Sequence, residues 1–287
     1  MTPIPPPVSS RSPSAEFHPS YIWLISTVAA LGGLLFGWDW VVIGGAKPFF
    51  ESFFQLKDPS LVGWANSCAL LGCLAGAIVT GTVSDRFGRR RPLLFAALLF
   101  AATSLGDAFA GTFTVFVAWR ILGGVAIGLA SGLSPLYISQ IAPAARRGRL
   151  VSLNQLTIVI GILLAQYLNW FLVRKLPASA TDEFIRGSWF GQEGWRWMFG
   201  LTAAPSALFF FGMCFVPESP RWLAQRRRDA EARAILARVA GPAHAEAEML
   251  EIRRALASGS GTKVSLRELL DPKLRRVLVL GIVLAVF

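Results

Sequence analysis

The sequence predicts an all-α fold of the polytopic membrane class, and composition and charge spacing are the observations that predict it. Of the 287 residues, 54% are apolar and 16% are charged, whereas about 25% of the residues in soluble domains are charged. The mean hydropathy is +0.52. The charges leave long uncharged stretches at residues 17–38, 60–84, 92–106, 121–145, 150–173 and 197–217. Most of these reach the ~20 helical residues that cross a bilayer core of about 30 Å.

Six membrane-spanning helices are predicted when each span ends where charges begin. They are expected at about residues 21–45, 61–83, 92–110, 112–136, 150–172 and 197–216. Together they form a predicted transmembrane bundle over residues 21–216. A further apolar run at 277–287 is too short to cross a bilayer, and we interpret it as the truncated start of a seventh span.

The loops predict the orientation of these spans, because cytoplasmic loops are enriched in Lys and Arg. One side carries Arg86, Arg89, Arg90, Arg91, Arg146, Arg147, Arg149, Arg221, Arg226, Arg227 and Arg228. The other side carries Lys47, Lys57, Arg174, Lys175 and Arg186. The first side is therefore predicted to be cytoplasmic, in the cell (inner or plasma) membrane. These loops also explain the net charge of +11, so the expected partner is the lipid bilayer and no nucleic acid is predicted.

Residues 1–20 are predicted to be a disordered cytoplasmic tail, on the same side as the arginine-rich loops. They are rich in proline. They are not interpreted as a signal peptide, because they contain no apolar segment of their own and the apolar run that follows is too long for one.

Residues 217–276 are predicted to be a cytoplasmic linker that contains short amphipathic helices. Charges are dense here, and apolar residues recur at helical spacing. These residues are Ala232, Ile235, Leu236 and Val239, then Met249, Ile252 and Leu256. Two roles remain open, a bundle that supports a gate and a solvated tether between two membrane halves.

Small residues recur at every fourth position of several spans, as in Gly124, Gly128 and Gly132. In lipid no hydrophobic force drives one helix against another, so such residues let backbones approach and gain van der Waals contact. We interpret these stripes as packing surfaces.

Two charges lie well inside predicted spans, Asp39 in the first and Arg120 in the fourth. Within these bounds Asp39 lies six residues and Arg120 eight residues from the outer boundary, or roughly 9–12 Å. An unpaired charge there costs about 2.5–3.5 kcal/mol, and an opposite charge at 4 Å recovers about 4 kcal/mol at an effective dielectric of 20. The two side chains are therefore predicted to meet. Two roles are open, a static ion pair and a proton site in which the carboxylate is protonated when it leaves the arginine.

The fifth predicted span has a polar face instead of a charge, with Gln155, Gln166 and Asn169 at helical spacing. Amides in hydrocarbon need partners, so this face is expected to contact protein or a wet cavity. Amides that donate and accept suit a neutral polyol, and bonds to neighbouring helices are the alternative. Phe36 offers an aromatic face to a sugar ring or, alternatively, packs in the core.

No His, Cys or carboxylate cluster with catalytic or metal-ligand spacing occurs within the predicted spans. The sequence therefore predicts no enzyme, no metal site and no cofactor.

The run from Gly81 to Arg90, G-x-x-x-D-R-F-G-R-R, resembles the signature loop of the major facilitator superfamily. Four further segments are similar to motifs of its sugar porter family, and especially to proton-coupled sugar symporters. They are Gly37-Trp38-Asp39 with Ile43-Gly44-Gly45, the helix-four pattern from Arg120 to Gly148, Gln155-Leu156 with Gly161, and Pro217 to Leu223. The resemblance covers residues 21–287.

The resemblance implies roles for particular positions. Asp39 and Arg120 match the proton-coupling pair, while Phe36, Gln155 and Ile162 match substrate-binding positions. The cytoplasmic gate, a network of salt bridges that closes the inner side, is matched by Asp85, Arg89, Gln140, Arg147, Glu218 and Arg221. Gln140 replaces the usual glutamate there, and Ile162 replaces a second sugar-contacting glutamine of the xylose symporters.

The resemblance also implies an incomplete chain. Family members have two six-helix halves with the substrate between them, and this sequence matches the N-terminal half and stops within helix seven. We expect a fragment or truncated product whose partner is the missing C-terminal half or a second half-carrier. The expected function is transport of a hexose or pentose by alternating access with proton symport. The alternatives are a non-transporting sugar sensor and a carrier of another small organic solute.

Overall fold

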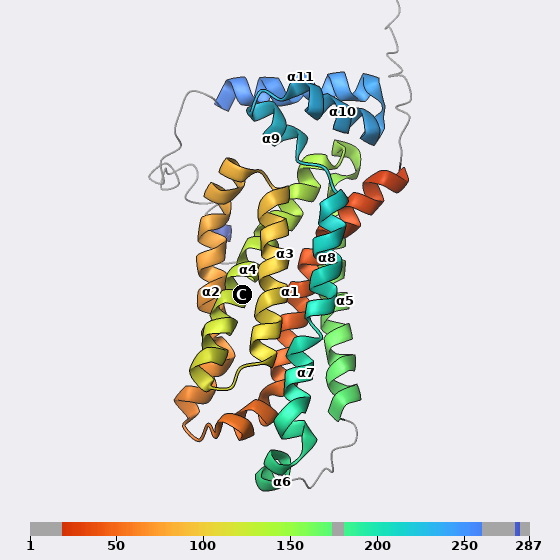
Figure 1. The fold of residues 1–287 in the computed structure, drawn as a ribbon. Helices are drawn as coiled ribbons and strands as arrows, with labels where there is room; N and C mark the ends of the chain where they lie inside the picture. Colours follow the sequence, from red (N-terminus) through yellow and green to blue (C-terminus); the bar gives the residue numbers. More distant parts are fainter. Residues whose placement is uncertain (1–18, 174–180, 260–278, 282–287) are drawn as a thin grey trace, which may run out of the picture.

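The computed structural model describes residues 19–173, 181–259 and 279–281, and within these ranges the regular structure is entirely helical (Figure 1). The long helices run side by side along one axis. Helices α9–α11 lie across one end of this bundle, and the short helix α6 lies at the other end. We name these the α9–α11 end and the α6 end.

Six candidate membrane spans are present in the described ranges, which confirms the predicted number of spans. The helices are α1 (Pro19–Phe54), α2 (Pro59–Phe87), α3 (Arg90–Ala108), α4 (Phe113–Ile141), α5 (Arg147–Val173), α6 (Asp182–Gly187), α7 (Trp195–Gly200), α8 (Ala203–Phe215), α9 (Pro220–Gln225), α10 (Asp229–Ala240) and α11 (Pro242–Gly259). A 3₁₀ turn, η1 (Ala144–Arg146), precedes α5, and a π-helical turn, η2 (Phe190–Gly194), precedes α7.

Local sequence signals set several helix ends. Asp58 caps α2 by accepting from the Ser60 amide at 2.9 Å, and Pro59 follows at the first helical position, where its missing N–H costs nothing. Thr112 caps α4 in the same way. Gly88 ends α2 with φ +88°, a value that favours glycine.

Two spans differ most from the predicted boundaries. Helix α1 continues nine residues beyond the expected end at 45, because Phe49 and Phe50 are buried in an aromatic cluster with Phe116 and Trp195. The sixth span runs over Phe190–Phe215 instead of 197–216 and is broken after α7. Pro205 explains the break, because it cannot donate the helical hydrogen bond to the Leu201 carbonyl.

Close packing brings α2 against α4 and α1 against α5 at glycines. A Cβ atom on Gly72 would lie 1.9 Å from the Ile121 carbonyl oxygen, and one on Gly37 would lie 2.1 Å from the Ile158 carbonyl oxygen. The glycine stripes therefore serve as packing surfaces, as predicted.

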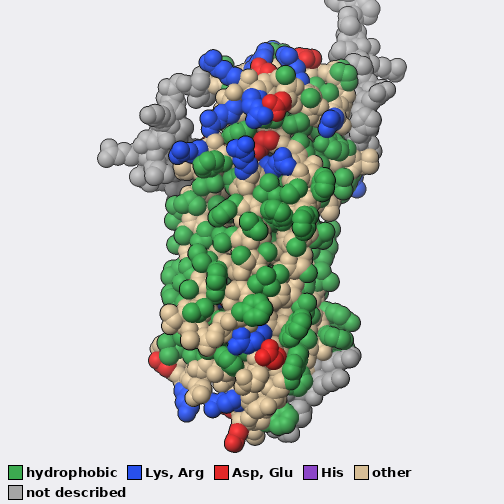
Figure 2. Space-filling view, viewed as in Figure 1, with side chains coloured by type: hydrophobic (Ala, Val, Ile, Leu, Met, Phe, Trp, Pro, Cys, Tyr) green, Lys and Arg blue, Asp and Glu red, His purple; other side chains and the backbone are tan. Residues whose placement is uncertain are grey.

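The surface has an apolar middle and charged ends, as a protein that crosses a bilayer requires (Figure 2). Apolar side chains cover the middle of the molecule, and Lys, Arg, Asp and Glu gather at its two ends. At the α9–α11 end the predicted amphipathic helices form, with Leu236 and Val239 of α10 and Met249 and Ile252 of α11 buried. The predicted tail before residue 19, the linker from 260 to 276 and most of the predicted seventh span lie outside the described residues.

Candidate functional site

The two charges predicted to meet inside the membrane form a buried ion pair between α1 and α4. Arg120 Nη1 donates to Asp39 Oδ1 at 2.6 Å, and Nη2 donates to Asp39 Oδ2 at 3.0 Å. Only 10% of the Asp39 side chain and 4% of the Arg120 side chain are exposed. Two parallel hydrogen bonds make this the bidentate geometry that is strongest between arginine and carboxylate. The predicted contact is confirmed.

A third ionisable group, Asp107 of α3, lies against this pair and was not predicted. Its Oδ2 atom is 3.9 Å from Arg120 Nη1, and 4% of its side chain is exposed. The Arg120 guanidinium also lies 5.4 Å from the centre of the Phe199 ring of α7. Asp107 lies inside the predicted third span, 92–110, three residues before its end. The short connection between the third and fourth helices could have indicated this contact, because it brings α3 and α4 side by side.

A small cavity borders the ion pair on the side facing α2. It measures about 30 Å³, and its lining includes Asp39, Trp40, Asn66, Cys73 and Arg120. This volume is sufficient for a water molecule, which needs about 10–15 Å³ on the same measure. The Asp39 carboxylate is therefore within reach of water although the pair is buried.

The predicted substrate-binding residues lie on α1 and α5. Gln155 is exposed and Ile162 is half-buried on α5. Phe36 is half-buried on α1 and packs edge-on against Trp40, with ring centres 6.2 Å apart. Asn169, from the same predicted polar face, donates to the Val41 carbonyl of α1 at 3.1 Å. Asn169 therefore hydrogen-bonds a neighbouring helix, which was the alternative to binding a polyol.

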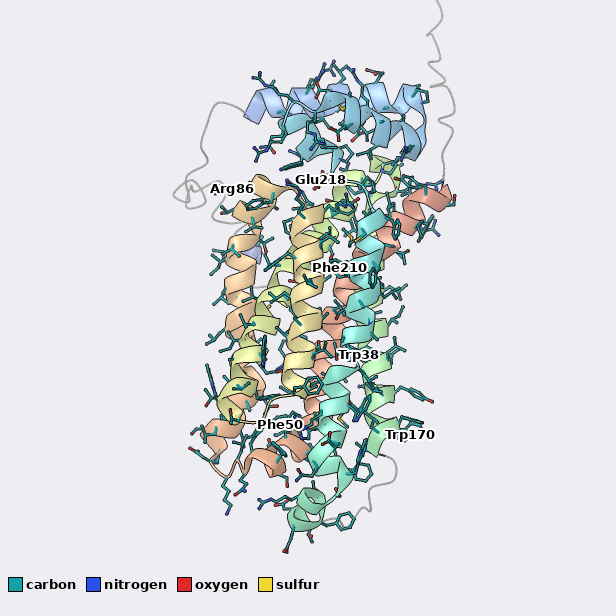
Figure 3. The ribbon with its side chains drawn as sticks, viewed as in Figure 1. Trp38, Phe50, Arg86, Trp170, Phe210 and Glu218 are labelled. Atoms are coloured by element: carbon teal, nitrogen blue, oxygen red, sulfur yellow. The ribbon has the colours of Figure 1, made fainter. Side chains whose placement is uncertain are left out.

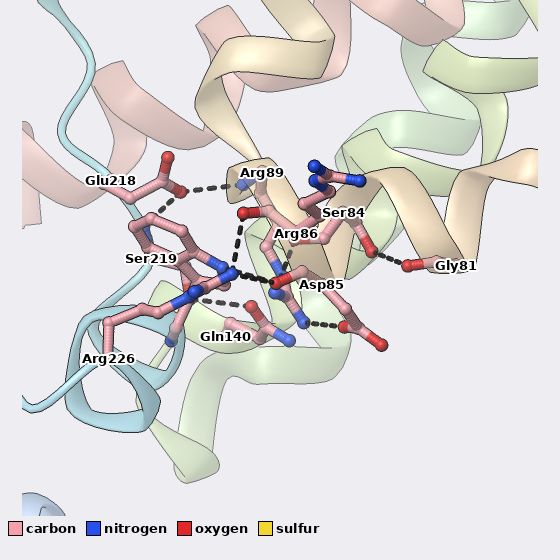
Figure 4. A network of polar contacts seen from close by, with 10 residues as sticks. Gly81, Ser84, Asp85, Arg86, Arg89, Gln140, Glu218, Ser219 and Arg226 are labelled. Carbon is pink, nitrogen blue, oxygen red and sulfur yellow. Dashed lines mark hydrogen bonds and ion pairs between the residues drawn. The ribbon is translucent and has the colours of Figure 1, made fainter.

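A second polar network joins the α2–α3 connection to the segment before α9 (Figure 4; Arg86 and Glu218 are also labelled in Figure 3). Glu218 Oε1 accepts from the backbone amides of Arg89 at 2.8 Å, Arg90 at 3.2 Å and Ser219 at 2.8 Å. The carboxylate thus lies at the N-terminus of α3, where helix amides attract negative charge. A Cβ on Gly88 would lie 2.3 Å from Glu218 Oε2, so glycine also makes room for this contact.

Asp85, Arg89 and Gln140 complete this network. The Arg89 Nη2 to Asp85 Oδ1 distance is 3.6 Å, and Gln140 Oε1 accepts from Ser219 Oγ at 2.7 Å. Burial lowers the pKa of the Arg89 guanidinium from its ordinary value, while the Asp85 and Glu218 carboxylates oppose that shift. Trp222, which was not predicted, donates from Nε1 to the Asp85 carbonyl at 3.0 Å and so attaches α9 to α2.

Arg147 and Arg221 were expected in the salt-bridge network but do not take part in it. Within the part of the chain that the structure describes, neither forms an ion pair. Both line a neighbouring cavity of about 270 Å³ together with Gln140, Glu248 and Glu251. Among the described residues Glu218 forms no ion pair with an arginine side chain, and its carboxylate accepts from backbone amides next to the turn at Gly88 instead. The predicted network is therefore formed only in part.

The comparisons with known proteins agree with this architecture. Residues 25–287 match the family model described as "Sugar (and other) transporter". The chain is 37% identical to the D-xylose-proton symporter of Escherichia coli strain K12, over 96% of this chain and 58% of that protein. It is 40% identical to the arabinose-proton symporter of Bacillus subtilis, over 93% of this chain and 55% of that protein.

Solved structures agree as well. The proton:xylose symporter XylE bound to 6-bromo-6-deoxy-D-glucose superposes with a TM-score of 0.78 at 39% identity, over 85% of this chain and 55% of that chain. The inward-open form of the E. coli xylose transporter gives a TM-score of 0.74. Our chain spans a little over half the length of these relatives.

The chain is therefore a multi-pass α-helical membrane protein, and its family consists of transporters and not of enzymes. The chain belongs to the sugar porter family of the major facilitator superfamily and corresponds to the N-terminal half of its fold.

Proposed function

We propose that this chain forms the N-terminal half of a proton-coupled sugar transporter that works by alternating access. The observation that carries this proposal is the buried Asp39–Arg120 pair in a chain of the sugar porter family. The names of the xylose-proton and arabinose-proton symporters support the proton and a pentose as substrates.

Asp39 is the group proposed to carry the proton. Arginine keeps its proton under all physiological conditions, so only the carboxylate of the pair can change charge. Two unit charges about 3 Å apart attract each other by roughly 5 kcal/mol at an effective dielectric of 20. Protonation of Asp39 removes most of this attraction between α1 and α4. Proton binding is thereby linked to a change in how these two helices pack.

The sugar is proposed to contact Phe36, Gln155 and Ile162. Gln155 is exposed on α5, and its amide both donates and accepts hydrogen bonds, as a sugar hydroxyl does. Phe36 offers an apolar ring next to Trp40. Transporters of this architecture bind their substrate between two repeats, so the proposed partner of this face is a second six-helix half.

The α9–α11 end is proposed to be cytoplasmic, because its arginines follow the positive-inside rule. In this orientation the network of Asp85, Arg89, Gln140 and Glu218 attaches α2, α3 and α4 to the segment before α9. We propose that it holds the cytoplasmic side closed while the other side is open. Arg147 and Arg221, at the neighbouring cavity, are proposed to join this gate only in another conformation.

The test uses the protein produced from the complete gene and purified into lipid vesicles. With an inward proton gradient, the unchanged protein should accumulate xylose, arabinose or glucose. Asp39→Asn should lose accumulation and retain exchange of labelled for unlabelled sugar, because the neutral amide resembles the protonated acid. Asp182→Asn on exposed α6 is the matched control and should accumulate sugar normally. Unchanged accumulation by Asp39→Asn would exclude the proton role, and absence of both accumulation and exchange in the unchanged protein would exclude sugar transport.

A further inference from the structure

Arg120 has two carboxylate neighbours from two different helices. Asp39 of α1 is hydrogen-bonded to it, and Asp107 of α3 lies at 3.9 Å from the same Nη1 atom. All three side chains are at least nine-tenths buried. If both acids were ionised, the three groups would carry a net charge of −1 away from water, which is costly.

The hydrogen bonds of this cluster are incomplete. Within the described ranges, Asp107 Oδ1 is buried without a hydrogen-bond partner, and so is Arg120 Nε. A buried carboxylate oxygen without a donor is expensive, whereas a proton on the same carboxyl group removes its charge. Arg120 Nε is in turn a free donor that could serve Asp107. The cluster therefore has two acids that compete for one guanidinium.

The surrounding helices offer few other charges. Helix α2 contributes the thiols of Cys68 and Cys73. Helix α7 contributes Arg196, whose Nη1 donates to the Ala108 carbonyl at 2.6 Å, next to exposed Glu193 of η2. Helix α8 contains no Asp, Glu, Lys, Arg or His, and in α5 these residue types occur only at the α9–α11 end. In the described ranges Arg120 is the ion-pair partner of Asp107.

We propose that Asp39, Arg120 and Asp107 bind the proton as a unit, with Asp107 as the second acid of the proton site. This inference rests on the proposed function only in taking the proton as the coupling ion. With Asp107 ionised, uptake of a proton changes the cluster from −1 to neutral. With Asp39 and Arg120 alone, the same uptake would change it from neutral to +1. Asp107 thus moves proton binding to higher pH and leaves Arg120 with a partner when Asp39 is protonated.

The test is a pH titration of this chain in lipid vesicles, followed by the infrared C=O stretch of protonated carboxyl groups. The cluster's contribution is the signal that disappears in the Asp39→Asn, Asp107→Asn double variant. Asp107→Asn alone should shift the midpoint of that signal to lower pH by about one unit or more, because the remaining acid has Arg120 to itself. Asp39→Asn should shift it in the same direction. Asp182→Asn, on exposed α6, should leave the midpoint unchanged. An unchanged midpoint in Asp107→Asn would overturn the proposal.

A double-variant cycle on thermal unfolding gives a second measurement. Either single variant leaves Arg120 with one carboxylate, whereas the double variant leaves it buried and unpaired. The double variant should therefore lower the unfolding temperature by more than the sum of the single effects, and additive effects would contradict a shared counter-ion. Neither measurement needs sugar or transport. Failure of the transport test and failure of this inference are therefore distinguishable.

Discussion

Gly124 of α4 lies so close to α2 that a Cβ atom on it would fall 2.0 Å from the carbonyl oxygen of Ala69. Gly128, one turn later, has the same relationship with the Cys73 carbonyl at 2.2 Å. Contacts of this kind bring the two backbones together, and they set the positions of α2 and α4 on either side of the cavity next to Asp39 and Arg120.

Gly124→Ala is expected to destabilise the bundle. The added methyl group would meet backbone, which cannot rotate away, so α2 and α4 must separate at a cost of about 1–3 kcal/mol. The unfolding temperature in detergent measures this loss. Gly63→Ala in α2 is the matched control, since a Cβ there would meet no described residue beyond its own stretch of helix within 4 Å. It should leave stability unchanged or raise it by up to about 1 kcal/mol. Equal effects of the two variants would contradict the packing argument.

Glu218→Gln is expected to loosen the α2–α3 connection. The amide oxygen still accepts hydrogen bonds, but the negative charge at the N-terminus of α3 is lost, at a cost of about 1–2 kcal/mol. Trypsin should therefore cleave faster at the arginines of residues 86–91. Glu231→Gln serves as the control, because its ion pair with Arg228 is about half exposed and contributes little. Equal cleavage rates of Glu218→Gln and the unchanged chain would argue against a capping role.

The proposed orientation predicts which end of the molecule can be labelled from outside the cell. Glu231→Cys at the α9–α11 end should react with a membrane-impermeant maleimide only after the cells are permeabilised. Asp182→Cys on α6 should react in intact cells, since both positions are exposed. Background should be low because Cys68, Cys73 and Cys214 all lie within the spans. The reverse labelling pattern would invert the topology.

Gln155→Ala is expected to raise the sugar concentration that gives half-maximal transport by up to about tenfold, the loss of roughly one hydrogen bond. Stability should change little, because Gln155 is exposed on α5. Leu156→Ala, at the adjacent exposed position, is the control and should leave sugar affinity unaltered. Uptake kinetics of both variants in vesicles give the comparison, and similar values for them would remove Gln155 from the sugar site.

Much of the architecture could be predicted because a bilayer imposes length and polarity on each helix separately. Uncharged stretches of about 20 residues marked the six spans, and glycine spacing marked the packing surfaces. The Asp39–Arg120 contact was also predictable, because two opposite charges at matching depth gain from meeting. Helix ends were less accurate where packing overrides charge, as for the last turns of α1 around Phe49 and Phe50.

By itself, the sequence determined which segments cross the membrane and which charged side chains need a partner there, because these depend on local composition and on the cost of burying charge. Only the tertiary structure decided which groups meet across helices. It brought Asp107 of α3 to Arg120 and directed the Glu218 carboxylate to backbone amides instead of an arginine side chain. Such contacts depend on helix rotation and on the direction of a turn at a single glycine, and spacing along the chain does not specify either.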